Sequence, residues 1–145
     1  MKVVVQRVKH TSLSVNGQLI SEIPFGLAVY LGVKVGDTDD MPAQMAKKIA
    51  AMRIFEDENG KMNLSVRDVG GEILLISQFT LYGDCSHGNR PGFTMAERPE
   101  RADMLYERTA EELRMLGVTV KTGVFGADMK IEQYNDGPVT IIYEI

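Results

Sequence analysis

Residues 73–82 read Ile-Leu-Leu-Ile-Ser-Gln-Phe-Thr-Leu-Tyr, four aliphatic residues followed directly by polar ones. Such a short apolar run is typical of a strand that is buried on both faces of a sheet. A second run, residues 25–33, is also almost wholly apolar and predicts another buried strand. Polar groups that follow a buried strand often form ligand sites, so residues 77–82 are a candidate site.

Strand patterns also occur on both sides of these two runs. Residues 3–8 are rich in valine, and residues 12–20 alternate in polarity around Asn16-Gly17. Asn-Gly between alternating stretches is the strongest short signal for a hairpin, because both turn residues need a positive φ. Three further patterns near the end of the chain predict strands at residues 118–125, 129–134 and 139–145.

Two stretches of the sequence predict helices. Apolar residues recur every three or four positions after Pro42 and again after Pro99, and proline is favoured in the first turn of a helix. Gly117 ends the second helix. Strands combined with two long helices predict one mixed α/β domain over residues 1–145.

The composition excludes several classes of function. A chain of 145 residues has the length of one domain, and its net charge of −4 argues against broad binding to nucleic acid. One cysteine excludes an intrachain disulfide and a thiolate zinc site, and two histidines exclude a three-histidine metal site. We therefore expect no metal and no cofactor. No apolar run reaches the roughly 18 residues of a membrane span, and no signal peptide is found, so we expect a cytoplasmic protein.

The segment 77–82 contains one possible nucleophile. The hydroxyl of Thr80 needs a base to become nucleophilic, and no histidine or acidic residue lies close to it in the sequence. The alternative is that Ser77 and Thr80 simply bond to backbone groups. The local sequence leaves both interpretations open.

Residues 135–140, Asn-Asp-Gly-Pro-Val-Thr, also have two interpretations. The simpler one is a turn before the last strand. The other is a protruding loop with a cis Gly137–Pro138 bond, because an X-Pro bond adopts the cis form at small cost. Carbonyl groups on such a loop could accept hydrogen bonds from an ammonium group, and its rigid backbone could exclude a side chain of the wrong hand.

Several arginines lack an obvious partner in the sequence. Arg7 lies between valines, so it is either exposed or bound to backbone carbonyls. His87, Arg90, Arg98 and Arg101 concentrate positive charge in one segment, which is either a phosphate-binding patch or a solvated loop.

Seven motifs together resemble those of the D-aminoacyl-tRNA deacylases, once called D-tyrosyl-tRNA deacylases. The resemblance covers the chain end to end, and the motifs at residues 77–82 and 135–140 are highly specific in combination. The seven motifs are Val5-Gln6-Arg7-Val8, Arg53-Ile54-Phe55-Glu56-Asp57, Lys61-Met62-Asn63-Leu64-Ser65-Val66, residues 77–82, Arg90-Pro91, Phe125-Gly126-Ala127-Asp128-Met129 and residues 135–140.

The resemblance implies a fold, an assembly and a reaction. Members of this family are homodimers of a compact mixed α/β fold, with barrel-like sheets flanked by two main helices and with the active site at the dimer interface. They hydrolyse the ester between a D-amino acid and the 3′-terminal adenosine of tRNA, and they also accept glycyl-tRNA. The expected partners are therefore tRNA and a second copy of the chain, with no membrane.

The same resemblance assigns roles to the residues of the two specific motifs. The carbonyls of Gly137 and Pro138 are expected to capture the α-amino group of the substrate in the partner subunit's pocket and to exclude L side chains. Arg7 and Asn135 are expected to support that loop.

The strand end is expected to hold the ester and the terminal adenosine. Ser77 lies there, Gln78 is the expected backbone donor, Phe79 forms a wall, and Thr80 acts as the nucleophile or positions the substrate. In the RNA-assisted version, the ribose 2′-hydroxyl helps to activate water and backbone N–H groups stabilise the oxyanion.

Two other functions remain as alternatives. One is a sister deacylase that edits L-alanine from mischarged tRNA, although such relatives carry diverged motifs. The other is a nucleic-acid-binding module without catalysis, against which the negative net charge argues.

Overall fold

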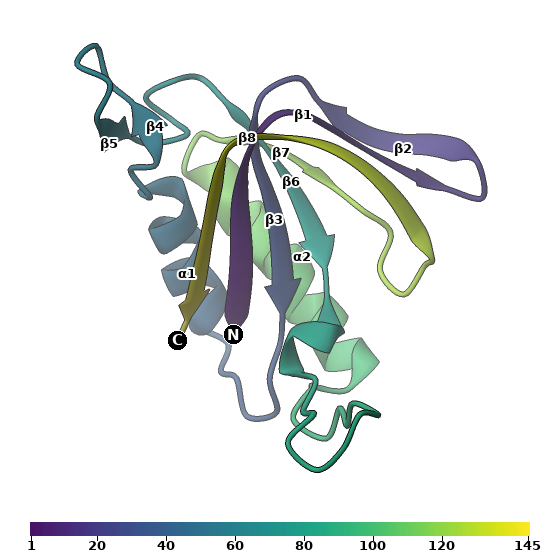
Figure 1. The fold of residues 1–145 in the computed structure, drawn as a ribbon. Coiled ribbons are helices and arrows are strands. Elements are labelled where there is room, and N and C mark those ends of the chain that lie inside the picture. The colour runs from purple at the N-terminus through teal and green to yellow at the C-terminus, as the bar shows by residue number, and fades with distance from the viewer.

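Strand β1 (Lys2–Val15) is the centre of the sheet in the computed structural model, which describes residues 1–145 (Figure 1). Along one edge it pairs antiparallel with β3 (Gly26–Gly32) and then with β2 (Gln18–Ile23). Along the other edge it pairs antiparallel with β8 (Met129–Glu144). The β1–β2 hairpin turns at Asn16-Gly17 with positive φ at both residues, which confirms the predicted hairpin.

The other edge of β3 continues the sheet with parallel strands. β3 pairs with β6 (Glu72–Ser77), and β6 pairs with β7 (Thr119–Thr122), so the strand order is β2-β1-β3-β6-β7. The two ends of this order are joined by side chains, because Ser21 Oγ donates to the Thr122 carbonyl at 2.6 Å and Lys121 Nζ donates to the Glu22 carbonyl at 2.6 Å. The result is a strongly curved, nearly closed sheet, as the predicted barrel-like fold requires.

The two predicted helices are α1 (Met41–Ala50) and α2 (Pro99–Met115), and both have proline in the first turn. They pack on the same face of the sheet (Figure 1). The hydroxyl of Tyr106 in α2 donates to the Leu75 carbonyl of β6 at 2.8 Å, which fixes the helix to the sheet. No helix of the structure combines the length and apolar character needed to cross a bilayer.

The central strands β3 and β6 are buried on both faces, as the two apolar runs predict. Alternate residues such as Leu27 and Leu75 belong to the large core between the sheet and the helices. Residues of opposite parity, Ala28, Leu74 and Ile76, belong to a smaller cluster inside the curve of the sheet. This alternation follows from the two-residue repeat of side chains along a strand.

Two predictions of strands differ from the structure, and one pair of strands was not predicted. The patterns 129–134 and 139–145 belong to one strand, β8, in which residues 136–139 form a bulge opposite Arg7. Of the two interpretations of residues 135–140, the turn between two strands is therefore wrong, and the Gly137–Pro138 bond is cis. The pattern 118–125 is shortened to β7. A small hairpin of β4 (Phe55–Glu56) and β5 (Met62–Leu64) follows α1.

One glycine allows the parallel pair β3–β6 to form. Gly26 has a φ of +140°, and a Cβ atom on it would lie 1.9 Å from the carbonyl oxygen of Glu72. The backbones of the two strands therefore meet directly at the point where their pairing begins.

We expect Gly26→Ala to lower the free energy of unfolding by at least about 3 kcal/mol, because the methyl group separates β3 from β6 and the positive φ is strained. Urea denaturation measures the loss. Gly36→Ala is the matched control, since Gly36 has a φ of +92° but no atom within 4 Å of an added Cβ. This control should lose about 1–2 kcal/mol. Equal losses in the two variants would contradict the close approach.

Candidate active site

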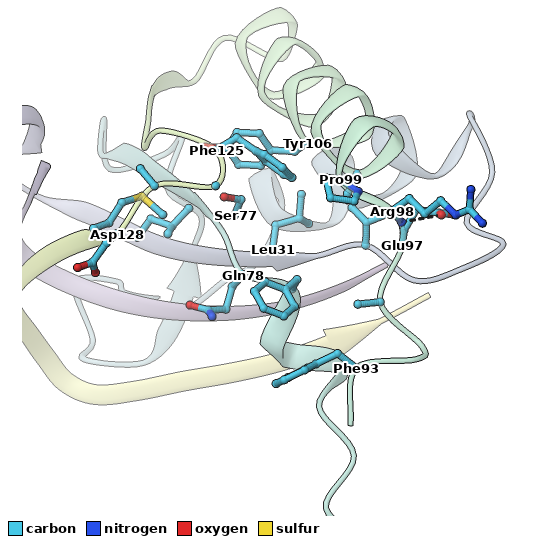
Figure 2. Close-up of a pocket in the computed structure, with 18 of the residues that line it drawn as sticks. Leu31, Ser77, Gln78, Phe93, Glu97, Arg98, Pro99, Tyr106, Phe125 and Asp128 are labelled. Carbon is cyan, nitrogen blue, oxygen red and sulfur yellow. Dashed lines mark hydrogen bonds between the residues drawn. The ribbon is translucent and has the colours of Figure 1, made fainter. Parts of the chain in front are cut away.

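A cavity of about 630 Å³ opens where β3 and β6 end (Figure 2). Its walls come from the ends of these strands, the first turns of α2, the segment before α2 and the segment that leads into β8. Twelve of its 19 lining residues are hydrophobic, which is typical of a ligand pocket. The lining includes Leu31, Val33, Ile76, Ser77, Gln78, Phe79, Phe93, Ala96, Glu97, Arg98, Pro99, Ala102, Tyr106, Phe125, Gly126, Ala127, Asp128, Met129 and Ile131.

The polar residues at the end of β6 lie on this cavity, and Figure 2 shows Ser77 between Phe125 and Leu31. After Gln78 the chain enters η1 (Phe79–Tyr82), a single turn of 3-10 helix. The N–H of Gln78 donates to the Leu31 carbonyl at 2.8 Å, so the expected role of Gln78 as backbone donor to a ligand is wrong.

The next two N–H groups remain available for a ligand. The internal hydrogen bonds of η1 begin with Leu81 N–H to the Gln78 carbonyl, so the N–H groups of Phe79 and Thr80 have no backbone partner. They follow one another at the edge of the cavity. Two adjacent free donors of this kind can stabilise an oxyanion without the help of a charged side chain.

Thr80 itself is exposed and lies next to the cavity without lining it. Its hydroxyl accepts a hydrogen bond from the Gln78 side-chain amide, which cannot remove a proton. No histidine or carboxylate is among its hydrogen-bond partners. The structure therefore gives Thr80 no general base.

Two phenylalanines form an aromatic wall of the cavity. Phe79 remains 56% exposed, and its ring meets that of Phe93 edge to face with 5.0 Å between the centroids. Both rings line the cavity. An exposed aromatic face next to polar backbone groups is suited to a ligand that combines a flat ring with a polar end.

The Gly137–Pro138 loop lies elsewhere on the same chain. Its peptide bond is cis, both residues are exposed, and neither lines the cavity. The loop forms a bulge opposite Arg7, which pairs with Leu27 of β3, whereas Leu31 on the cavity wall is four residues further along β3. At the rise of a strand, that separation is about 13 Å.

The buried side chain of Arg7 binds the backbone of this bulge. Its guanidinium donates from Nε to the Asp136 carbonyl at 3.1 Å and from Nη1 to the Ile54 carbonyl at 2.7 Å. Its Nε also lies 3.3 Å from the Asp136 carboxylate. Of the two alternatives for Arg7, the structure therefore has the buried arginine that binds backbone carbonyls. Asn135 is exposed at the start of the bulge and accepts a hydrogen bond from the Gln133 side chain.

The charge of the predicted basic segment is partly neutralised within the chain. Arg101 pairs with Asp39 at 2.9 Å and also contacts Glu97, so its charge is largely compensated. Arg98 is exposed at the cavity, and His87 and Arg90 are exposed on the loop closed by the Asp84–Gly92 bridge.

No group of three or more histidine, cysteine, aspartate or glutamate side chains is placed to bind a metal ion.

The family model described as D-Tyr-tRNA(Tyr) deacylase matches residues 4–144. The chain belongs to this family. It is 57% identical to a D-aminoacyl-tRNA deacylase of Geobacillus sp. (strain WCH70) over 99% of this chain and 95% of that protein. It is 50% identical to one of Lactobacillus delbrueckii subsp. bulgaricus over the whole of both chains. The predicted resemblance is confirmed, and the D-Tyr-tRNA(Tyr) deacylase family places the chain among hydrolases.

Solved structures agree on the fold. A structure described as "c-Myc DNA Unwinding Element Binding Protein" is 44% identical, with a TM-score of 0.92 over 100% of this chain and 99% of that chain. A probable eukaryotic D-amino acid tRNA deacylase is 19% identical, with a TM-score of 0.86 over 99% of this chain and 98% of that chain. At that identity the second likeness shows the fold alone.

Sequence reasoning missed part of this candidate site. It did not identify Phe93 or Tyr106 as cavity residues, because Phe93 lies in a polar loop and Tyr106 looks like an ordinary member of a helical apolar stripe. Phe125-Gly126 could have been predicted to line the cavity. Glycine after an apolar residue, between two strand patterns, indicates a turn, and such a turn can form the wall of a pocket.

We expect Arg7→Met to lower the free energy of unfolding by about 2–4 kcal/mol, because it leaves two backbone carbonyls without their donor. Lys9→Met is the matched control, since Lys9 also faces the Asp136 carboxylate, at 3.5 Å, but its side chain is 59% exposed. The control should change stability by less than about 1 kcal/mol. Thermal and urea unfolding of the two variants measure the difference, and similar losses would show that burial of Arg7 adds nothing.

Proposed function

We propose that this chain hydrolyses the ester that joins a D-amino acid, or glycine, to the 3′-terminal adenosine of tRNA and rejects L-aminoacyl-tRNA. Family membership supports the reaction class. The observation that carries the proposal is the division of the site. One chain has a cavity with free N–H donors at one end of β3 and a rigid backbone loop near the other end. Two copies of the chain can supply both halves to one active site.

In the proposed complex the adenosine and the ester occupy the cavity beside Phe79. A water molecule attacks the ester carbonyl carbon, and the N–H groups of Phe79 and Thr80 stabilise the resulting oxyanion. The bond to the ribose 3′-oxygen then breaks, that oxygen takes up a proton, and the free amino acid leaves as a carboxylate. The ribose 2′-hydroxyl assists the water, which agrees with the absence of a base beside Thr80.

Gly137 and Pro138 of one protomer are proposed to discriminate between D- and L-aminoacyl groups in the cavity of its partner. Their carbonyls accept hydrogen bonds from the substrate ammonium group. The loop is suited to exclusion because it consists of backbone held by the buried Arg7. A backbone wall cannot move away by changing rotamer, whereas a side chain can.

The same loop has no space for a larger residue. Gly137 has a φ of +135°, and a Cβ atom on it would lie 2.8 Å from Val139 Cγ2 and from Val139 N.

We expect Gly137→Ala to displace the loop and raise the ratio of kcat/KM for L-tyrosyl-tRNA to that for D-tyrosyl-tRNA by at least about tenfold. Deacylation assays with both substrates measure this ratio. Loss of activity with full D-selectivity would contradict the filter.

Thr80→Ala should retain D-tyrosyl-tRNA turnover within about tenfold of wild type, because the donors at this position belong to the backbone. Loss of a true nucleophile costs roughly 10⁴-fold or more. Thr80→Val, which keeps the shape of the side chain, is the matched control. A loss of that size in both variants would assign the nucleophile to Thr80.

Mixing two variants with complementary defects tests the divided site directly. Ala127→Trp fills the cavity and should abolish turnover, whereas Gly137→Ala displaces the loop and should let L-tyrosyl-tRNA be hydrolysed. In an equal mixture that exchanges subunits at random, half of the open cavities face an intact loop from an Ala127→Trp chain. L-tyrosyl-tRNA hydrolysis per Gly137→Ala chain should therefore fall to about half. An unchanged rate, although mass spectrometry shows mixed dimers, would place both halves in one chain.

A second candidate function is binding of DNA without catalysis. It is favoured by the 44% identity to the structure described as a DNA unwinding element binding protein. The net charge of −4 and the compensated Arg101 give this chain a weak electrostatic attraction for a duplex. A gel shift of duplex DNA by a preparation without deacylase activity would favour it. The L-alanyl-tRNA editing alternative is tested by offering L-alanyl-tRNA in the same deacylation assay.

A further inference from the structure

The turn η1, which carries the free N–H groups of the proposed site, rests directly on the sheet. It packs over Gly32 of β3, where an added Cβ atom would lie 3.0 Å from the Gln78 carbonyl oxygen and 3.1 Å from Leu81 Cβ. Gly32 is the register partner of Lys2 in β1. Because η1 packs over Gly32, the start of β1, which pairs with Gly32, also lies close to η1.

The side chain of Lys2 reaches the far end of this turn. Its Nζ lies 3.5 Å from the Leu81 carbonyl oxygen and 4.8 Å from the centre of the Tyr82 ring. Both contacts place a positive charge against a group that attracts cations: a carbonyl at the end of a helical turn and an aromatic face. Tyr82 is buried, so its ring is a fixed surface.

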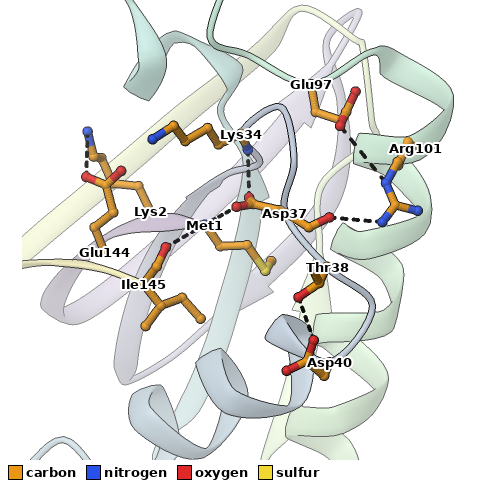
Figure 3. A network of polar contacts seen from close by, with 10 residues as sticks. All are labelled: Met1, Lys2, Lys34, Asp37, Thr38, Asp40, Glu97, Arg101, Glu144 and Ile145. Carbon is orange, nitrogen blue, oxygen red and sulfur yellow. Dashed lines mark hydrogen bonds and ion pairs between the residues drawn. The ribbon is translucent and has the colours of Figure 1, made fainter.

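Glu144 of β8 holds the Lys2 ammonium group in this place. The Lys2 Nζ lies 3.1 Å from Glu144 Oε2, as Figure 3 shows, and the two residues are register partners. Burial alone would raise the pKa of Glu144, but the hydrogen bond and charge of Lys2, together with smaller effects of Tyr82 and Lys34, keep that pKa below its ordinary value. The ion pair orients Lys2 toward η1 from the opposite edge of β1.

We propose that Lys2 is a positioning residue for the hydrolytic reaction. Its ammonium group fixes the end of η1 and thereby fixes the N–H groups of Phe79 and Thr80 at the cavity. The turn has four residues and a rise of about 2 Å per residue, so a displacement at Leu81 is transmitted to Phe79 with little loss. Lys2 lines no part of the cavity, so its effect would be exerted through η1. This inference rests on the proposed function.

The test compares Lys2→Met, which removes the charge, with Lys2→Arg, which keeps it. Steady-state hydrolysis of D-tyrosyl-tRNA gives kcat and KM separately, and amide hydrogen exchange of the peptide 78–83 reports the order of η1 without substrate. Arg108→Met is the matched control, because Arg108 forms an exposed ion pair with Glu112 at 3.0 Å in α2. Glu144→Gln frees the Lys2 side chain and is the second variant should Lys2→Met fail to fold.

Lys2→Met should lower kcat by about 10- to 100-fold with KM changed less than about threefold, because displacement of reacting groups by roughly 1 Å costs up to about 100-fold. Exchange of peptide 78–83 should become faster, while peptides of α2 keep their rates. Lys2→Arg should recover most of kcat, and Arg108→Met should match wild type.

Unchanged exchange of peptide 78–83 in Lys2→Met would overturn the proposal, and so would a wild-type kcat. A loss of kcat that Lys2→Arg does not recover would also overturn it, since it would show a steric effect. Failure of the wild-type chain to hydrolyse D-tyrosyl-tRNA would instead reject the proposed function. In that case the exchange measurement still decides whether Lys2 holds η1.

Discussion

Backbone hydrogen bonding along both edges of β1 is the constraint from which the rest of the fold follows. The strand gives one edge to β3 and β2 and the other to β8 over almost its whole length. Buried peptide groups need partners, so this arrangement fixes both ends of the chain and the start of the parallel sheet at once. The ladder is interrupted opposite Arg7, where a buried guanidinium supplies donors to the bulge. The same strand thus fixes the position of the bulge and, through Lys2, contacts η1.

The sequence predicts the local features whose signal lies within a few residues. Asn16-Gly17 marks a hairpin, Pro42 and Pro99 mark helix starts, and two apolar runs mark the strands buried on both faces. It cannot predict that β3 and β6 are parallel neighbours, because a pattern records that a face is buried but not what covers it. For residues 136–139 the sequence leaves a turn and a protruding loop open, because glycine and proline are common in both turns and bulges.

For the candidate site too, the local sequence predicts some features and long-range contacts decide the others. The motif at residues 77–82 identifies the right segment, but its chemistry depends on which N–H groups are already paired. Gln78 donates to Leu31, a residue 47 positions away in the sequence, so its N–H is lost to a ligand for a reason that no local pattern contains. For Arg7 the sequence left two alternatives, and the long-range contacts with Ile54 and Asp136 decide between them. Backbone groups dominate the site, and the identity of a residue says little about how its backbone is used.

The junction between β2 and β7 differs in kind from every other contact around the curved sheet. It is made by the side chains of Ser21 and Lys121, which donate to carbonyls across the gap, and no backbone ladder joins these strands. Ladder hydrogen bonds break together, whereas two side-chain bonds can exchange with water one at a time. The curve can therefore open here without loss of any strand pairing, and the cluster of Leu13, Ile23 and Leu74 behind it would be the first part of the interior to meet solvent. Closure of the barrel therefore depends on a few side-chain hydrogen bonds, whereas the strand order depends on backbone ladders.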